Sequence, residues 1–201
     1  IFNNAKLSGS PNDDGRNTVI ALSSGTNIDD NLPYTITNDA TPTTYWEQDL
    51  GLNNNSTLNA TNSALLKIRY KGVGGSGELE AATRFPFLWN TGTNRPQYVD
   101  GSGVKTLVSN GYFFVYFVYA VQDGRVGNTI RLTPAYAEYS SITNARAVTW
   151  ETVQTQDDAA KDTEIRPLYR LIFEYKSAYN VGCKYTLLCE VQDIRKAIIT
   201  Q

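Results

Sequence analysis

The strongest hydrophobic pattern in the chain is the run GYFFVYFVYAV at residues 111–121, where every residue after the glycine is apolar or aromatic. A membrane-spanning helix needs about 20 apolar residues, so the run is too short to cross a bilayer as a helix. Its Phe, Tyr and Val residues favour a strand, and both of its alternating faces are apolar. The pattern therefore predicts a central strand that is covered on both faces.

One face of this strand is expected to meet the core of the domain, and the other a helix, a second layer or a neighbouring subunit. The strand carries more apolar area than one core explains, and an obligate oligomer would bury the second face. The candidate interface residues are the aromatic side chains in its first half: Tyr112, Phe113, Phe114, Tyr116 and Phe117.

The N-terminal segment, residues 1–62, is rich in Asn, Ser, Thr, Asp and Gly, and forms either an attachment segment or the first strands. Short strands are expected within it at 18–22, 34–37 and 43–50. Alternation of apolar and polar residues over 65–70 predicts a half-buried strand, and the glycine-rich stretch 72–78 predicts a turn. We expect a β-sandwich-like module over residues 63–201.

The second half of the chain predicts a hairpin, a helix and two long strands. The aromatic strand is expected to turn back into TIRLTP, a strand that ends at Pro134. Apolar residues at three- and four-residue spacing predict a helix near 140–153, capped by Ser140 or Ser141 and placed to cover the aromatic strand. The predicted fold class is therefore all-β and β-sandwich-like, with one short helix.

Two strands, at 167–176 and 183–196, close the predicted module. In the second strand one face is expected to point inward and to carry the side chains of Tyr185, Leu187, Cys189 and Val191. Charged residues of opposite sign occupy the other faces of the two strands, and we expect them to pair between strands: Arg170, Glu174, Lys184 and Glu190.

The amino-acid composition excludes several kinds of catalytic and metal-binding site. The chain has no histidine, which excludes a Ser-His-Asp or Cys-His site and histidine-ligated metals within it. Its net charge of −2 gives no electrostatic reason to bind nucleic acid or an anionic membrane. We expect no cofactor and no metal. Cys183 and Cys189 would lie roughly 20 Å apart on one strand, so they are either free thiols or members of an intermolecular bridge.

Candidate chemistry is sparse. The acidic pairs at 13–14, 29–30 and 157–158 are interpreted as turn residues, because they lack the spacing of a calcium loop. A glycosidase needs two facing carboxylates, and the sequence nominates no pair. Tryptophan stacks on sugars, so Trp89, beside a polar turn, and Trp46 are the candidate glycan-binding residues, while Trp150 is expected in the core.

A set of motifs resembles a known group of proteins. The order is GYFFVYFVYAV, then TPAYAEYSS, ARAVTWETV, PLYRLIFEYKSAYN and VQDIRK, preceded by RFPFLWNTGTN. Over roughly residues 84–196 this resembles the C-terminal regions of tail-fibre and appendage proteins of tailed bacteriophages. The resemblance implies a non-catalytic protein of the virion surface, exposed outside the cell. It implies a homotrimer that contacts other virion proteins and a host-surface glycan or protein, and it supplies no catalytic residues.

Two other functions stay open at this point. One is a secreted carbohydrate-binding or adhesin domain with a β-sandwich fold, which would be monomeric and display an exposed Trp or Tyr. The other is a glycan depolymerase that uses two carboxylates. We expect host-surface attachment without catalysis, and neither nucleic-acid binding nor membrane insertion.

Overall fold

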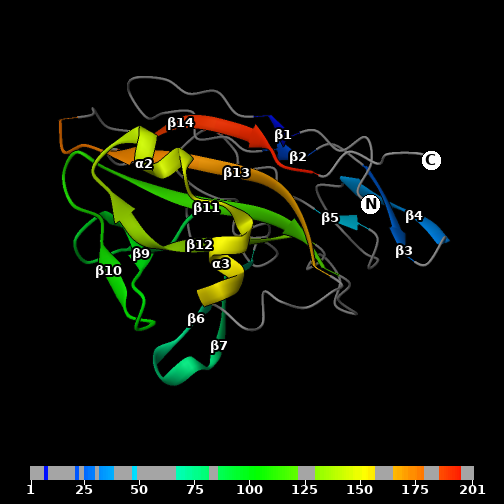
Figure 1. Ribbon diagram of the computed structural model, residues 1–201, viewed down its shortest axis with the longest axis horizontal. Coiled ribbons are helices and arrows are strands. Elements are labelled where there is room, and N and C mark those ends of the chain that lie inside the picture. The colour runs from blue at the N-terminus through cyan, green and yellow to red at the C-terminus, as the bar shows by residue number, and fades with distance from the viewer. Residues whose placement is uncertain are drawn as a thin grey trace.

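A computed structural model describes the stretches 67–81, 86–121, 130–156, 165–178 and 186–195, together with five short strands nearer the N-terminus. In the described part strands predominate, and α-helices occur only between residues 142 and 156 (Figure 1). The all-β class with a short helical segment is therefore confirmed. No helix of the described part is long and apolar enough to cross a membrane.

The main sheet has six strands in the order β14-β13-β11-β12-β6-β7. Their bounds are Lys67–Lys71 (β6), Gly77–Ala81 (β7), Tyr112–Ala120 (β11), Ile130–Tyr139 (β12), Arg166–Tyr175 (β13) and Thr186–Asp193 (β14). The aromatic strand β11 pairs antiparallel with β12 on one side and with β13 on the other. It is central, as the absence of a polar face predicts.

Each face of this sheet has its own cover (Figure 1). One is a three-stranded sheet in the order β10-β9-β8. Its strands are Trp89–Asn90 (β8), Arg95–Val99 (β9) and Lys105–Leu107 (β10). The other cover is a pair of short helices, Ile142–Arg146 (α2) and Trp150–Gln156 (α3), so the predicted single helix is in fact broken in two. The Ser141 side chain caps α2 by accepting a hydrogen bond from the backbone N–H of Asn144, as predicted.

The N-terminal strands form two small sheets. Leu7–Ser8 (β1) pairs with Ala21–Leu22 (β2), and a second sheet has the order β3-β4-β5. Its strands are Gly25–Asp29 (β3), Leu32–Asn38 (β4) and Glu47–Gln48 (β5). Strands thus occur within all three of the ranges predicted in this segment.

Aromatic rings fill the space between the two sheets. Phe87 lies edge-on to Phe114 and Phe173, with ring centroids 5.3 and 5.1 Å away, and Phe114 stacks on Phe173 at 5.2 Å. Trp89 and Tyr116 complete the cluster, 6.3 and 6.4 Å from Phe87. Such pairs add about 0.5–1.5 kcal/mol each beyond their area burial, so this layer contributes strongly to the stability of the described core.

The hydroxyl of Tyr116 joins the two sheets. It accepts a hydrogen bond from the backbone N–H of Leu88 at 3.0 Å and donates one to the carbonyl of Gln97 at 3.1 Å. Burial raises the pKa of Tyr116 well above its usual value, so the phenol keeps the proton that it donates. The tyrosine thereby satisfies two backbone groups that would otherwise be buried without partners.

We expect Tyr116→Phe to destabilise the protein by about 2 kcal/mol, because it leaves both of these backbone groups unsatisfied. Tyr112, at the exposed end of the same strand, is the matched control. Tyr112→Phe should change stability by less than about 0.5 kcal/mol. Urea unfolding of the two variants measures the difference, and equal losses would show that the Tyr116 hydroxyl has no such role.

Register shifts interrupt the main sheet at three places. They lie beside Pro134 in β12, beside Pro167 in β13, and at Cys189 in β14. The prediction that a strand ends at Pro134 is wrong: Pro134 pairs with Tyr116 immediately before a register shift, and β12 continues beyond that shift to Tyr139.

The predicted inward face of β14 is also wrong. Thr186 and Leu188 are buried, whereas Leu187 and Cys189 are only half-buried. The register skips Cys189, so the alternation of side chains changes face at this residue. A single inserted residue therefore inverts the pattern that the sequence suggests.

Candidate functional site

The predicted glycan-binding and interface residues differ in how far they are exposed to solvent. Trp89 is 7% exposed and packs against Phe87, so its face is not free to stack on a sugar, and Trp46 lies outside the described residues. Of the proposed interface side chains, Phe114, Tyr116 and Phe117 are fully buried within one chain. These assignments of Trp89 and of the three strand residues are therefore corrected.

The second face of β11 is covered by the chain's own helices. The ring of Trp150 lies edge-on to Phe117 at 5.7 Å and tilted against Tyr119 at 5.7 Å. This confirms the predicted core position of Trp150 and the predicted cover by the helical segment. Only Tyr112, 36% exposed, and the half-buried Phe113 remain accessible among the five candidates.

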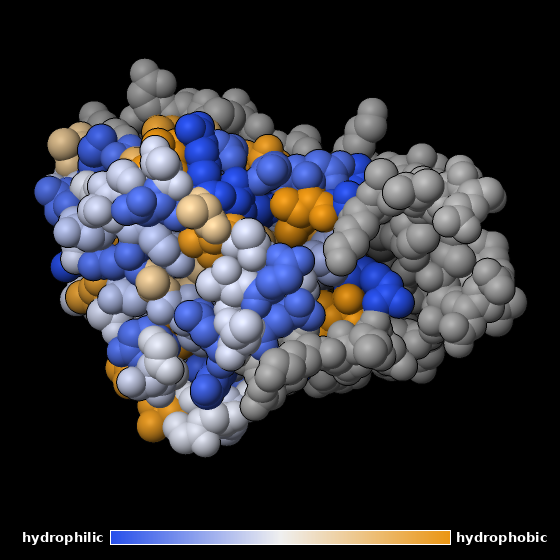
Figure 2. All heavy atoms as spheres, viewed as in Figure 1, coloured by the Kyte–Doolittle hydropathy of each residue, from blue (hydrophilic) through white to orange (hydrophobic). Residues whose placement is uncertain are grey.

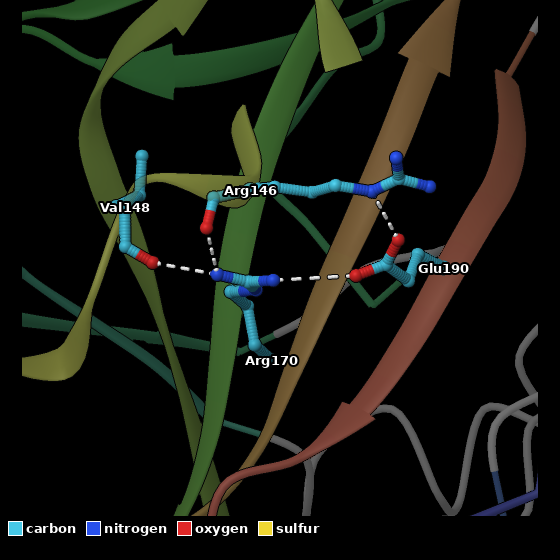
Figure 3. Close-up of polar contacts among 4 residues, drawn as sticks. All are labelled: Arg146, Val148, Arg170 and Glu190. Carbon is cyan, nitrogen blue, oxygen red and sulfur yellow. Dashed lines mark hydrogen bonds and ion pairs between the residues drawn. The ribbon is translucent and has the colours of Figure 1, made fainter. Parts of the chain in front are cut away.

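Charged groups come together where the helices meet the sheet (Figure 3). The Arg170 guanidinium on β13 donates to the carbonyl oxygens of Arg146 and Val148, between the two helices, and to Glu190 on β14 at 3.2 Å. Arg146 lies 2.6 Å from the other oxygen of Glu190. The predicted pairing of Arg170 with Glu190 is confirmed, and Lys184 lies outside the described residues.

The electrostatics of this cluster suit a structural role. Burial alone would raise the pKa of Glu190, but hydrogen bonds from Arg146 and Arg170 outweigh it and hold that pKa below its usual value. A general acid needs a raised pKa instead. Glu174, on the same face of β13, lies 2.7 Å from Lys176. The lowered pKa of Glu190 therefore does not suit the role of a general acid.

The lowered pKa of Glu190 has a consequence for acid stability. A carboxyl group whose pKa falls on folding stabilises the protein above its unfolded pKa, and this contribution is lost as the pH drops through the folded value. We therefore expect Glu190→Gln to be less stable than the wild type at neutral pH. The difference should shrink between about pH 5 and pH 3. Thermal unfolding across this range tests the expectation, and a constant difference would contradict it.

Two turns meet at the most exposed end of the described part. The β6–β7 turn and the β9–β10 turn come so close that a Cβ on Gly103 would lie 2.4 Å from the backbone of Gly72. The Asp100 carboxylate holds the second turn by accepting from the N–H groups of Ser102 and Val104. Both turns are therefore held in fixed conformations.

The paired turns expose apolar side chains. Val73 is 70% exposed and Val104 is 46% exposed. Figure 2 shows hydrophobic residues at this lower end, beside the tips of the two hairpins. Beneath them Glu80 lies 2.8 Å from Lys105 and accepts a hydrogen bond from Tyr70 at 3.1 Å. Burial, and then the charge of Glu80, raise the pKa of Tyr70. Loops that carry binding residues on a rigid scaffold have this arrangement.

Within the described stretches, the remaining candidate residues form no further site. Three or more potential metal-ligating side chains are not grouped anywhere in the described stretches. The acidic pairs fall outside them, except that Asp29 ends β3. Cys189 is a free, half-buried thiol, and burial raises its pKa to about 12, so it is protonated at neutral pH. Cys183 is outside the described residues.

Sequence reasoning identified the turn at 72–78 but neither the second turn nor the contact between the two. The stretch 72–78 was predicted as a turn from its glycines, and Asp100-Gly101-Ser102-Gly103 carries the same signal. Apolar residues next to such glycines, at Val73 and Val104, were the available hint.

No model of a known protein family matches the chain, and neither a curated protein nor a solved structure matches it.

Proposed function

We propose that the protein is a structural component of a bacteriophage virion surface, a tail-fibre or appendage module that contributes to attachment to the host surface without catalysis. The sequence resemblance over roughly residues 84–196 motivates the proposal. The structural observation that carries it is the pair of fixed turns, which present Val73 and Val104 on a scaffold packed with aromatic rings. Two of the described carboxylates, Glu190 and Glu174, are held in ion pairs, which is consistent with a structural role.

The test is binding of the fluorescently labelled chain to a panel of Gram-negative and Gram-positive bacterial cells. We expect saturable binding to at least one strain and no release of reducing sugar ends from its surface polysaccharide. Exposed apolar side chains at an interface centre can each contribute more than about 1 kcal/mol. The double variant Val73→Asp/Val104→Asp should therefore bind about tenfold more weakly.

The matched control is Thr143→Asp/Asn144→Asp, which also adds two carboxylates at exposed positions, on α2 and away from both turns. It should bind as the wild type does. Absence of binding to every strain would overturn the proposed function, and release of reducing ends would replace it with depolymerisation. Equal binding by the valine variant would remove the paired turns from the proposal.

We propose that the protein assembles as a homotrimer. This proposal rests on the resemblance alone, because the chain itself buries most of β11 and leaves little of that strand for a contact between subunits. Light scattering of the purified chain should give about three times the 22.3 kDa of one chain. Loss of reducing agent should not change this mass. A mass of one chain would overturn the trimer and favour a monomeric carbohydrate-binding domain.

A further inference from the structure

In the β6–β7 hairpin, the acidic and the basic side chains lie on opposite faces of the sheet. Glu78 and Glu80 of β7 lie opposite Tyr70 and Ile68, on the face that meets the three-stranded sheet. There Glu80 pairs with Lys105, and Glu78 accepts a hydrogen bond from Ser76. The carboxylates of this hairpin therefore have partners on one side of the sheet.

The opposite, helix-bearing face of the hairpin carries only cations among its charged side chains. Lys67, Arg69 and Lys71 alternate with the buried Ile68 and Tyr70, so all three side chains lie on this face. Arg131 of β12 pairs in register with Lys67 and adds a fourth cation. We call these four residues the β6 cationic row. Figure 2 shows hydrophilic residues over this hairpin, below α3.

The row is accessible at its two ends. Lys67 and Lys71 are half-exposed, and no described carboxylate lies within ion-pair distance of either ammonium group. They lie four residues apart on a strand, which corresponds to about 13 Å. Arg131 is 6% exposed, and burial, with a further contribution from Arg69, lowers its pKa. Arg131 is therefore buried beside Lys67 at one end of the row, while the two lysines are partly open to solvent.

We propose that the β6 cationic row binds an anionic polysaccharide, one that carries carboxylate or phosphate groups along its chain. This names the ligand chemistry of the attachment site and rests on the proposed function. A cation every second residue along one strand suits a ligand that runs along that strand and presents repeated negative charges. The exposed Val73 and Leu79, which is opposite Arg69, lie beside the row and can contact the apolar faces of sugar rings.

A polysaccharide fits this surface better than nucleic acid. The row is short and the whole chain has a net charge of −2, so a long and densely charged polymer would meet repulsion beyond the hairpin. Base stacking would need exposed aromatic rings next to the cations. Tyr70, the nearest ring on β6, is buried on the other face.

The experiment measures binding of the full chain to immobilised polygalacturonate, with neutral dextran and a short DNA duplex as separate arms. The wild type should bind polygalacturonate and not dextran. Binding should weaken as NaCl rises from about 50 to about 300 mM, because salt screens exposed charges. The double variant Lys67→Gln/Lys71→Gln should bind about tenfold more weakly, as expected from the loss of two exposed ionic contacts.

The matched control is Arg146→Gln/Lys176→Gln, which also removes two positive charges but from exposed positions outside the row and the paired turns. It should bind polygalacturonate as the wild type does. Equal weakening in both double variants, or stronger binding to DNA than to polygalacturonate, would overturn the proposal.

Binding of the same variants to bacterial cells separates this proposal from the proposed function. If the wild type binds cells and Lys67→Gln/Lys71→Gln binds them equally well, the cationic row is excluded and attachment stands. If the row binds polygalacturonate but the wild type binds no cells, attachment fails and the polysaccharide site stands.

Discussion

Replacing Arg170 with methionine is expected to destabilise the protein by about 3 kcal/mol. The Arg170 side chain is 8% exposed and donates to two carbonyl oxygens between α2 and α3, as well as to Glu190. Methionine fills a similar volume but leaves both carbonyls without their donor. We expect the helical layer to loosen from the sheet, which hydrogen exchange of the amides in α2 and α3 would detect along with urea unfolding.

The control for this prediction is Arg146→Gln. Arg146 pairs with the same carboxylate but is 54% exposed, and exposed ion pairs contribute at most about 1 kcal/mol. If the two variants lose equal stability, the cost comes from the shared Glu190 contact and not from the carbonyls that only Arg170 reaches.

Gly103→Ala is the second substitution with a large expected effect. Gly103 has a φ of +85°, and its Cβ would lie 2.4 Å from the backbone of Gly72. A left-handed conformation alone costs a residue with a side chain roughly 1–2 kcal/mol. The backbone contact adds to this, because neither turn can move without breaking its hydrogen bonds. We expect a total loss of about 3 kcal/mol or more.

Substitution of Gly111 measures the conformational part of that stability loss separately. Its φ is +81°, but a Cβ there would have no atom within 4 Å. Gly111→Ala should therefore cost about 1 kcal/mol, measured by the same urea unfolding. A similar loss at both glycines would mean that the contact between the two turns does not restrict Gly103.

The sequence predicted what depends on short-range pattern. The ten apolar residues after Gly111 specified a central strand, and alternation around Ile68 specified a half-buried one. Pattern alone cannot show which layer covers a face. The second face of β11 was assigned in part to another subunit, whereas Trp150 and the helices of the same chain occupy it.

The errors at particular residues share a physical cause. Trp89 was expected beside a turn and in contact with solvent, but the three-stranded sheet turns its ring toward Phe87. The inward face of β14 was assigned by strict alternation, which the bulge at Cys189 interrupts. The contact between Gly72 and Gly103 joins turns from different hairpins. Tertiary packing decides each of these positions, and no local pattern records it.

The two prolines beside the register shifts also limit how the chain can misfold. Pro134 pairs with Tyr116 at the last position before the shift, so a slip of one residue between β11 and β12 would place it, without an N–H to donate, opposite a different residue of β11. The same slip would exchange the faces of β12 and bring Arg131 among the aromatic rings. A one-residue slip of β12 is therefore costly, although the sheet is largely apolar and its strands resemble one another in sequence.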